Sequence, residues 1–185
     1  MRVIAGSARG ILLSTPKKGG VRPTPSRVKK SLFDILASRV IGARVIDLFA
    51  GSGSLGIEAL SRGARQCCFI DHSDHCCHTI VQNLTRTRLL EQATVLKADA
   101  RQKIYWFSNQ GIAADLIFLD PPYYSQLILP VIAAIAAANI LANDGIVIME
   151  HPSKYIPVTE GYHQLVQKQY GDSAITLLKM KADNN

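Results

Sequence analysis

The strongest constraint on the fold is the regular alternation of short apolar runs with helix-length segments from Arg44 onward. Short, mostly apolar runs rich in Val, Ile, Leu and Phe are typical of strands buried on both faces of a parallel sheet. Helical segments between them favour an α/β fold with both faces covered. The expected strands are 45–49, 67–71, 94–98, 116–120 and 146–150, and the expected helices are 54–63, 74–88, 102–108 and 126–140.

The C-terminal part of the chain departs from this alternation. Residues 164–170 and 174–180 are strand-like runs joined tightly at Gly171-Asp172. Such an arrangement predicts an antiparallel hairpin rather than another strand–helix–strand unit.

The N-terminal part departs from it as well. Residues 1–15 predict a small hairpin, and the Pro- and Gly-rich residues 16–25 predict a loop. Ser26 then begins a helix with the apolar stripe Val28, Leu32, Ile35 and Leu36. We therefore expect an extension over 1–43 and a sheet domain over 44–185.

Positive charge is concentrated in the N-terminal extension. Ten of the 21 Lys and Arg residues lie within residues 1–44, which contain one acidic residue, Asp34. This segment carries a formal charge of +9 in a chain of +7, so the remainder sums to −2. The asymmetry favours an anionic polymer held at one end, although a merely solvated basic face gives the same pattern. The candidate contacts are Arg9, Arg22, Arg27, Lys29 and Lys30.

The sequence gives no sign of a membrane segment or of secretion. The longest apolar stretch, 127–142, is interrupted by Pro130 and Asn139, and the N-terminus has no apolar signal region. We expect a cytoplasmic protein with no membrane partner. The four cysteines form two adjacent pairs, Cys67-Cys68 and Cys76-Cys77, which suit neither a disulfide framework nor zinc spacing. Despite His72, His75 and His78 nearby, we expect reduced thiols and no metal.

A glycine-rich turn follows the first strand. Gly51-x-Gly53-x-x-Gly56 lies between that strand and a helix, and Asp71 ends the next strand twenty residues after Gly51. This spacing also satisfies the dinucleotide fingerprint, in which the acid binds a ribose diol. Asp47, just before the turn, would repel a pyrophosphate but attract the ammonium and sulfonium of S-adenosylmethionine. With Asp99 after the third strand, the acids favour a cationic nucleoside over NAD.

The fourth strand ends in Asp120-Pro121-Pro122-Tyr123. The exocyclic amine of a nucleic-acid base is a poor nucleophile because its lone pair is delocalised into the ring. The Asp120 carboxylate and the Pro121 carbonyl can accept its N–H groups, and the proline rings stiffen the turn. Tyr123 can stack on the base. These residues predict methyl transfer to a base that has left its stack.

Together these motifs resemble the RsmD group of bacterial small-subunit ribosomal RNA guanine-N2 methyltransferases. The resemblance covers nearly the whole chain and rests on five segments: IAGSARG, RPTPSRVKKSLFD, DLFAGSGSLGIEALSRGA, LIFLDPPY and GIVIMEH. It implies a Rossmann-like class I methyltransferase with seven strands in a mostly parallel sheet and the last strand reversed. The family usually has an acid at the position of Ser26 and another near Lys30, so this chain is more basic in that region.

The resemblance also implies the roles of site residues. S-adenosylmethionine would lie on the Gly51–Gly53 turn, with Asp71 on its ribose and Asp99 and Ala100 on its adenine. Asp120 and Tyr123 would serve a guanine of 16S rRNA. The remaining candidates are Asp47, Phe49, Ala50 and His72 for the cofactor, and Thr24 and Pro122 for RNA. The expected partner is ribosomal RNA within a small-subunit particle, bound by a monomer.

Three other functions fit part of the sequence. Asp-Pro-Pro-Tyr serves any exocyclic amine, so an adenine-N6 or cytosine-N4 methyltransferase is the main alternative. An oxidoreductase could use the glycine turn, but Asp47 and Asp120 argue against it. A non-catalytic RNA-binding module would not need a carboxylate at Asp120.

Overall fold

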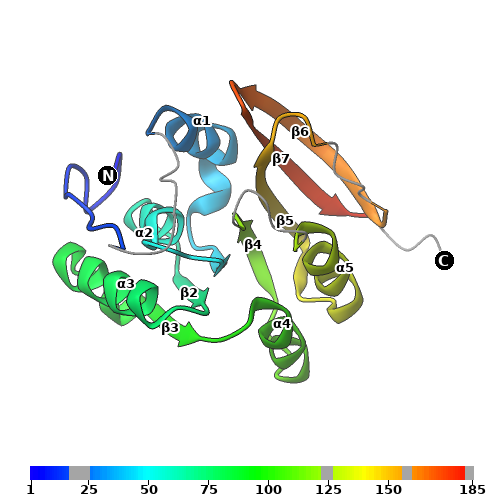
Figure 1. The fold of residues 1–185 in the computed structure, drawn as a ribbon, viewed down its shortest axis with the longest axis horizontal. Coiled ribbons are helices and arrows are strands. Elements are labelled where there is room, and N and C mark those ends of the chain that lie inside the picture. Colours follow the sequence, from blue (N-terminus) through cyan, green and yellow to red (C-terminus); the bar gives the residue numbers. More distant parts are fainter. Residues whose placement is uncertain (17–25, 122–126, 156–159, 182–185) are drawn as a thin grey trace.

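The computed structural model describes residues 1–16, 26–121, 127–155 and 160–181. Within them, seven strands form one sheet, with helices on both sides (Figure 1). The strands are β1 (Arg44–Leu48), β2 (Gln66–Asp71), β3 (Ala93–Lys97), β4 (Ala114–Leu119), β5 (Leu141–Pro152), β6 (Tyr162–Tyr170) and β7 (Ser173–Met180). The helices are α1 (Ser26–Leu36), α2 (Ser54–Ser61), α3 (Asp74–Thr87), α4 (Ala100–Asn109) and α5 (Ile128–Ala138), with short 3₁₀ turns η1 (Ala37–Val40) and η2 (Leu90–Gln92).

The strand order is β3-β2-β1-β4-β5-β7-β6. Strands β1 to β5 pair in parallel, whereas β7 is antiparallel to both β5 and β6. The predicted reversal of the last strand is therefore confirmed. The chain changes direction across the sheet between β1 and β4, and ligands of open α/β sheets bind at such switch points, outside the carboxyl ends of the strands.

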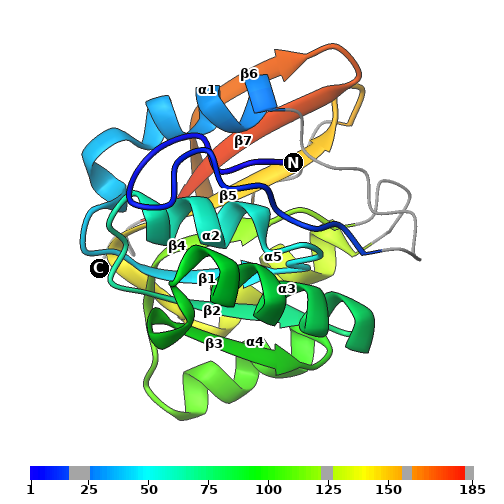
Figure 2. The same cartoon turned by 90° about the vertical axis from the view of Figure 1, so that its left-hand side faces the viewer.

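The two faces of the sheet carry different helices (Figures 1 and 2). Helices α1, α2 and α3 share one core cluster with β1 and β2, while α4 and α5 share a second cluster with β4 and β5. The α/β architecture is thus confirmed. One boundary prediction was wrong: β5 begins at Leu141, not at residue 146, because a bulge in β5 between Leu141 and Ile146, opposite Ala114 and Leu116 of β4, lets both parts of β5 pair with β4.

The N-terminal residues form a second layer over α2 (Figure 2). Arg2 and Leu12 form an antiparallel bridge, so the predicted hairpin is present in a minimal form. All eight residues of α2 are buried, since the sheet covers one side and the N-terminal segment covers the other. The glycine loop that precedes α2 is therefore held from both sides.

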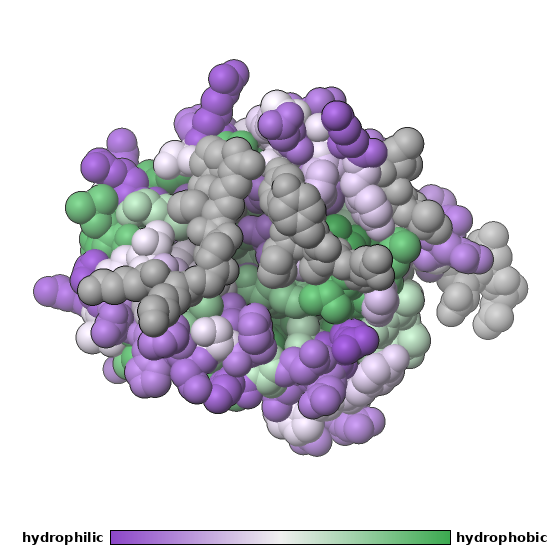
Figure 3. Space-filling model, in the orientation of Figure 1, coloured by the Kyte–Doolittle hydropathy of each residue, from purple (hydrophilic) through white to green (hydrophobic). Residues whose placement is uncertain are grey.

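No helix in the described parts of the chain is long and apolar enough to cross a membrane. Seen as in Figure 1, the surface has apolar side chains near the middle of this face and mainly hydrophilic ones around its margin (Figure 3).

Candidate active site at the carboxyl ends of the strands

The strand register brings three acids to one edge of the sheet. Leu48 pairs with Ile70 on one side and with Leu119 on the other. The next residues along β2 and β4, Asp71 and Asp120, therefore lie level with Phe49. Adjacent strands are about 4.8 Å apart, so these two acids flank the start of the glycine loop at nearly equal distance. Asp99 follows β3 on the far side of Asp71.

The glycine loop turns sharply where the cofactor was expected. Phe49, Gly51 and Gly53 have φ angles of 68°, 55° and 76°, in the left-handed region. The Gly53 N–H donates to the Ala50 carbonyl at 2.7 Å, which closes the turn. A left-handed residue other than glycine costs on the order of 1–3 kcal/mol, and such strain is concentrated at functional sites. Phe49 is therefore held in this conformation by its surroundings.

Gly56 permits close packing of α2 on the sheet. A Cβ atom at this position would lie 2.3 Å from Phe69 Cε1 and 2.6 Å from Cys67 Sγ, both on β2. The third glycine of the fingerprint serves the same purpose in dinucleotide-binding folds. This glycine fixes the helix against the sheet and does not identify the ligand.

Asp47 lies beneath the loop rather than at its surface. Its side chain is 2% exposed, and Oδ2 accepts the Gly56 N–H at 3.0 Å. Burial raises the pKa of Asp47 to about 7, the Gly56 hydrogen bond opposes this, and the charge of Asp71 adds to it. Asp47 therefore positions the junction of the glycine loop and α2. Its carboxyl group is not exposed at the surface of the crevice.

Asp71 joins β2 to the glycine loop. Its Oδ2 accepts the Gly51 N–H at 2.9 Å, and its Oδ1 accepts the Ser73 N–H at 2.9 Å. The carboxylate is 7% exposed. Each carboxylate oxygen has a second lone pair, so this geometry still permits hydrogen bonds from hydroxyl groups of a ligand. His72 lies beside it, exposed, with Nδ1 3.6 Å from Asp71 Oδ1.

Asp99 caps the N-terminus of α4. Its Oδ1 accepts the N–H groups of Arg101 and Gln102 at 2.9 and 3.2 Å, and the side chain is about half exposed, at 46%. The next residue, Ala100, is buried. The cap alone accounts for an acid at this position. Its role toward an adenine stays a prediction.

The proposed catalytic motif is described in part. Asp120 is partly buried directly after β4, and Pro121 is buried behind it. Pro122 and Tyr123 lie outside the described residues. Asp120 directly follows Leu119, which pairs with Leu48 of β1, so it lies near the start of the glycine loop.

The N-terminal basic residues divide into exposed and buried ones. Arg9, Arg27 and Lys30 are exposed, and Lys30 Nζ donates to Asp34 at 2.9 Å. Arg22 and Thr24 lie outside the described residues. The prediction for Lys29 was wrong: its side chain is fully buried and paired with Glu58, so it does not reach RNA phosphates. The helical stripe of Val28 and Leu32 also turns residue 29 inward.

Sequence reasoning missed two buried polar residues, Glu58 and Asn83, neither of which is exposed. Glu58 is the only charged residue of α2. A carboxylate within a mostly apolar helix could have indicated a buried basic partner, because carboxylates are rarely buried unless they are paired.

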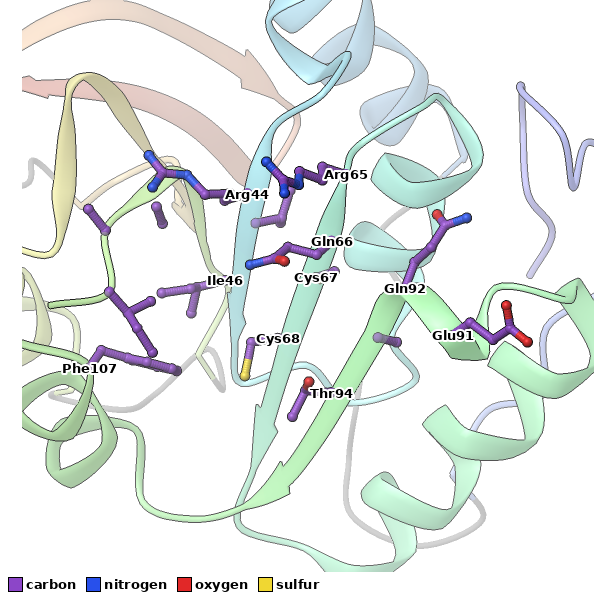
Figure 4. A pocket seen from close by; sticks show the side chains of 15 residues that line it. Arg44, Ile46, Arg65, Gln66, Cys67, Cys68, Glu91, Gln92, Thr94 and Phe107 are labelled. Carbon is purple, nitrogen blue, oxygen red and sulfur yellow. The ribbon is translucent and has the colours of Figure 1, made fainter. Parts of the chain in front are cut away.

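A separate hollow lies at the opposite, amino-terminal edge of the strands (Figure 4). It has a volume of about 270 Å³ and is lined by residues that begin β1 to β4, among them Arg44, Gln66, Ala93 and Ala114. Cys68 also lines it, and burial raises the pKa of this thiol to about 11. The hollow therefore lies away from the acids and the glycine loop.

The cysteines are all free thiols. Among the described residues, no three His, Cys, Asp or Glu side chains are grouped to hold a metal ion.

Comparison with solved structures defines the class of protein. The Escherichia coli protein yhhF, described as a candidate methyltransferase, superposes with a TM-score of 0.85, is 30% identical and is covered over 99% of both chains. SMU.776, a candidate methyltransferase complexed with SAH, shares the fold at a TM-score of 0.68 and 15% identity over 83% of this chain and 48% of its own. The chain has the Rossmann-like fold of class I methyltransferases.

Sequence comparison then gives the family. The chain belongs to the family described as Conserved hypothetical protein 95, whose model matches residues 1–179. YlbH of Bacillus subtilis, a candidate rRNA methyltransferase, is 36% identical over 98% of this chain and 100% of its own. Ribosomal RNA small subunit methyltransferase D of Escherichia coli K12 is 33% identical over 81% of this chain and 74% of its own.

Proposed function

We propose that this protein transfers a methyl group from S-adenosylmethionine to the exocyclic N2 of a guanine in 16S ribosomal RNA, in the cytoplasm. The observation that carries the proposal is the placement of Asp120 beside the glycine loop at the switch point of the sheet, in a chain whose relatives are named small-subunit rRNA methyltransferases. A methyl donor on the glycine loop and an amine at Asp120 would lie next to each other, because β1 and β4 are neighbouring strands.

The residues of the crevice fit a cationic nucleoside without phosphates. Residues 47–56 contain no Lys or Arg to neutralise a pyrophosphate, while Asp71 ends the adjacent strand. Asp71 would hold the ribose hydroxyls, and Asp99 and Ala100 would border the adenine. Phe49, Ala50 and His72 would complete the site. When bound, S-adenosylmethionine supplies a methyl group that its sulfonium already activates.

The chain's own contribution to catalysis would be positioning. Asp120 and the Pro121 carbonyl would accept the two N–H groups of the base and direct the nitrogen lone pair toward the methyl carbon. Tyr123 would stack on the ring and Pro122 would border it. As the amine becomes cationic, Asp120 stabilises the charge and can accept the departing proton. Orientation and preorganised charge of this kind supply most of the rate in such sites.

Substrate RNA would be held by the N-terminal segment, which we assign as the RNA-binding part over residues 1–43. Exposed Arg9, Arg27 and Lys30, with Arg22 and Thr24, would contact phosphates and sugars, which fix register without reading sequence. We infer that the enzyme acts as a monomer on a small-subunit particle.

The test is methylation of RNA and of small-subunit particles from a strain that lacks the gene. We expect one N2-methylguanosine in 16S rRNA, located by mass spectrometry, and none with Asp120→Ala. N6-methyladenosine would keep the mechanism but change the substrate. Tighter binding of NAD than of S-adenosylhomocysteine would overturn the proposal.

A further inference from the structure

Buried polar contacts hold described residues on both sides of the segment 17–25, which contains Arg22 and Thr24. On its N-terminal side, Asn83 of α3 binds the backbone of Ser14: the Ser14 N–H donates to Oδ1 at 2.8 Å, and Nδ2 donates to the Ser14 carbonyl at 3.0 Å. The same Nδ2 donates to the Ser52 carbonyl in the glycine loop at 2.9 Å. Asn83 therefore joins the N-terminal segment directly to that loop.

On the C-terminal side of the segment, Lys29 makes a similar connection. Its Nζ donates to the Arg2 carbonyl at 2.9 Å and to Ser54 Oγ at 3.1 Å, and lies 3.1 Å from Glu58 Oε2. An ammonium group has three N–H donors, so each has an acceptor here. Ser54 is the first residue of α2, directly after Gly53.

Glu58 fastens the hairpin to the same helix. Its two oxygens accept the N–H groups of Ile4 and Ala5 at 2.8 and 3.0 Å, and Arg62 Nε at 2.8 Å. Gly6 follows with a φ of +84°, and a Cβ there would lie 1.7 Å from the Ser61 carbonyl oxygen. The hairpin thus touches the backbone of α2, and only glycine fits.

These contacts converge on the two residues that flank Gly53. Asn83 reaches Ser52 and also binds Ser14 of the N-terminal segment. Lys29, which belongs to that segment, reaches Ser54 and Glu58 of α2 as well as Arg2. A buried polar group left without its partner costs about 1–3 kcal/mol, and more when charged. A shift of the glycine loop therefore has to be followed by the N-terminal segment, or these contacts break.

We propose that Asn83 and Lys29 are positioning residues that couple the two substrates, so that RNA on the N-terminal segment and the cofactor on the glycine loop each strengthen binding of the other. This inference rests on the proposed function. Because coupling between two binding sites is reciprocal, the same factor must appear in both directions.

The first experiment uses the wild-type protein. S-adenosylhomocysteine affinity is measured with and without 16S rRNA from the gene-deleted strain, and RNA affinity with and without S-adenosylhomocysteine. We expect equal factors within the range of about 5–150 that is typical of coupled sites. Affinities that do not depend on the other ligand would overturn the coupling. Failure of the protein to bind either ligand at all would instead contradict the proposed function.

The second experiment uses Asn83→Ala and Ser54→Ala, with Thr176→Val as a matched control. The control also removes a buried hydrogen bond, from Thr176 Oγ1 to His151 Nε2 at 2.9 Å, but its Thr176 lies on β7, three strands from β1 in the sheet. We expect the coupling factor to fall toward one in the first two variants and to persist in the control. Ser54→Ala leaves the Lys29–Glu58 pair in place, so it decides the matter if Asn83→Ala does not fold. An unchanged factor in Ser54→Ala would overturn the proposal.

Discussion

The two edges of the parallel sheet differ in what meets there. At the carboxyl edge, Asp71 and Asp120 flank a loop with three left-handed residues, and Asp47 lies buried below it. At the amino edge lies the hollow of about 270 Å³, beside an ion pair between Arg44 and Asp115 at 3.0 Å whose side chains are 42% and 36% exposed. One edge holds strained backbone and buried charge, and the other holds open space.

The candidate site is distinguished by the kinds of groups that meet there, not by the volume of the hollow. Helices α2, α3 and α4 each follow a strand after a short connection, so their N-termini gather at the carboxyl edge. The positive ends of the helix dipoles at this edge favour negatively charged groups. The amino edge receives helix C-termini, whose carbonyl groups and negative dipole ends favour cations instead.

The largest expected effect is a loss of methyl transfer on substitution of Asp120 at the carboxyl edge. Asp120→Ala should reduce methyl transfer by about 10²–10³, as removal of one preorganised electrostatic interaction does elsewhere. Binding of S-adenosylhomocysteine should persist. Single-turnover transfer to RNA from the gene-deleted strain measures the rate. Asp120→Asn should retain part of it if orientation dominates, and should match Asp120→Ala if the carboxylate must take the proton. Full activity in Asp120→Ala would refute the mechanism.

The next effect concerns cofactor affinity. Asp71→Ala should weaken S-adenosylhomocysteine binding by about 1–3 kcal/mol, since a buried polar partner is removed. It also removes the acceptor of the Gly51 N–H. Calorimetry measures the change, and Gln66→Ala at the amino edge is the control expected to bind normally. Equal losses of affinity in both variants would mean that the edges do not differ as argued.

A charge comparison tests RNA binding. Arg27→Gln with Lys30→Gln should lower the salt dependence of RNA affinity, by about 0.7–0.9 in the log–log slope for each phosphate that the protein no longer neutralises. The matched double variant Arg65→Gln with Arg88→Gln removes two exposed charges outside the N-terminal segment, directly before β2 and directly after α3. It should leave the slope nearly unchanged. The same slope in both doubles would show that the N-terminal segment has no special role.

The buried acid at the carboxyl edge should give an unusual pH dependence. The pKa of Asp47 is raised from 3.8 to about 7, so between these values the folded protein binds more protons than the unfolded chain. Stability from this group therefore falls as pH rises through that window. Asp47→Asn keeps an acceptor for the Gly56 N–H and should remove the fall. Urea unfolding at pH 5 and pH 8 measures it, and an identical pH dependence in both proteins would contradict the prediction.

The smallest effect belongs to the amino edge and has the opposite sign. The Arg44 hydrogen bond lowers the pKa of Asp115, so its contribution is present above the pKa of the unfolded state and is lost as pH falls through the folded value. Because the pair is more than one-third exposed, Asp115→Asn should cost less than about 1 kcal/mol near neutral pH. Methyl transfer should not change. A loss of activity would mean that this edge takes part in function.

The features that could be predicted from the sequence are those that local residue patterns determine. Continuous apolar runs placed five strands, and the glycine spacing placed the loop between β1 and α2 with Asp71 on the neighbouring strand. Both depend on residues close together in the chain or on the known geometry of parallel strands. The predicted roles of Arg22, Thr24, Pro122 and Tyr123 remain predictions, since these residues lie outside the described ranges.

The features that could not be predicted depend on contacts between residues far apart in the sequence. Lys29 and Lys30 are adjacent and identical, yet one is buried and the other exposed. Both count equally toward the net charge. The packing of α1 against α2 decides that Lys29 is buried and Lys30 is exposed. The bulge within β5 between Leu141 and Ile146 also depends on pairing with β4, not on composition. Phe49 carries no local signal for its left-handed backbone.

The docking of the N-terminal hairpin has a consequence for the time course of synthesis. Its anchors are far downstream: Ile4 binds Glu58 across 54 positions, and Ser14 binds Asn83 across 69. At roughly 5–20 residues per second, Asn83 is made about 3–14 s after Ser14. Throughout that interval the basic N-terminal hairpin has been synthesised, but the residues of α2 and α3 that receive it are not all present.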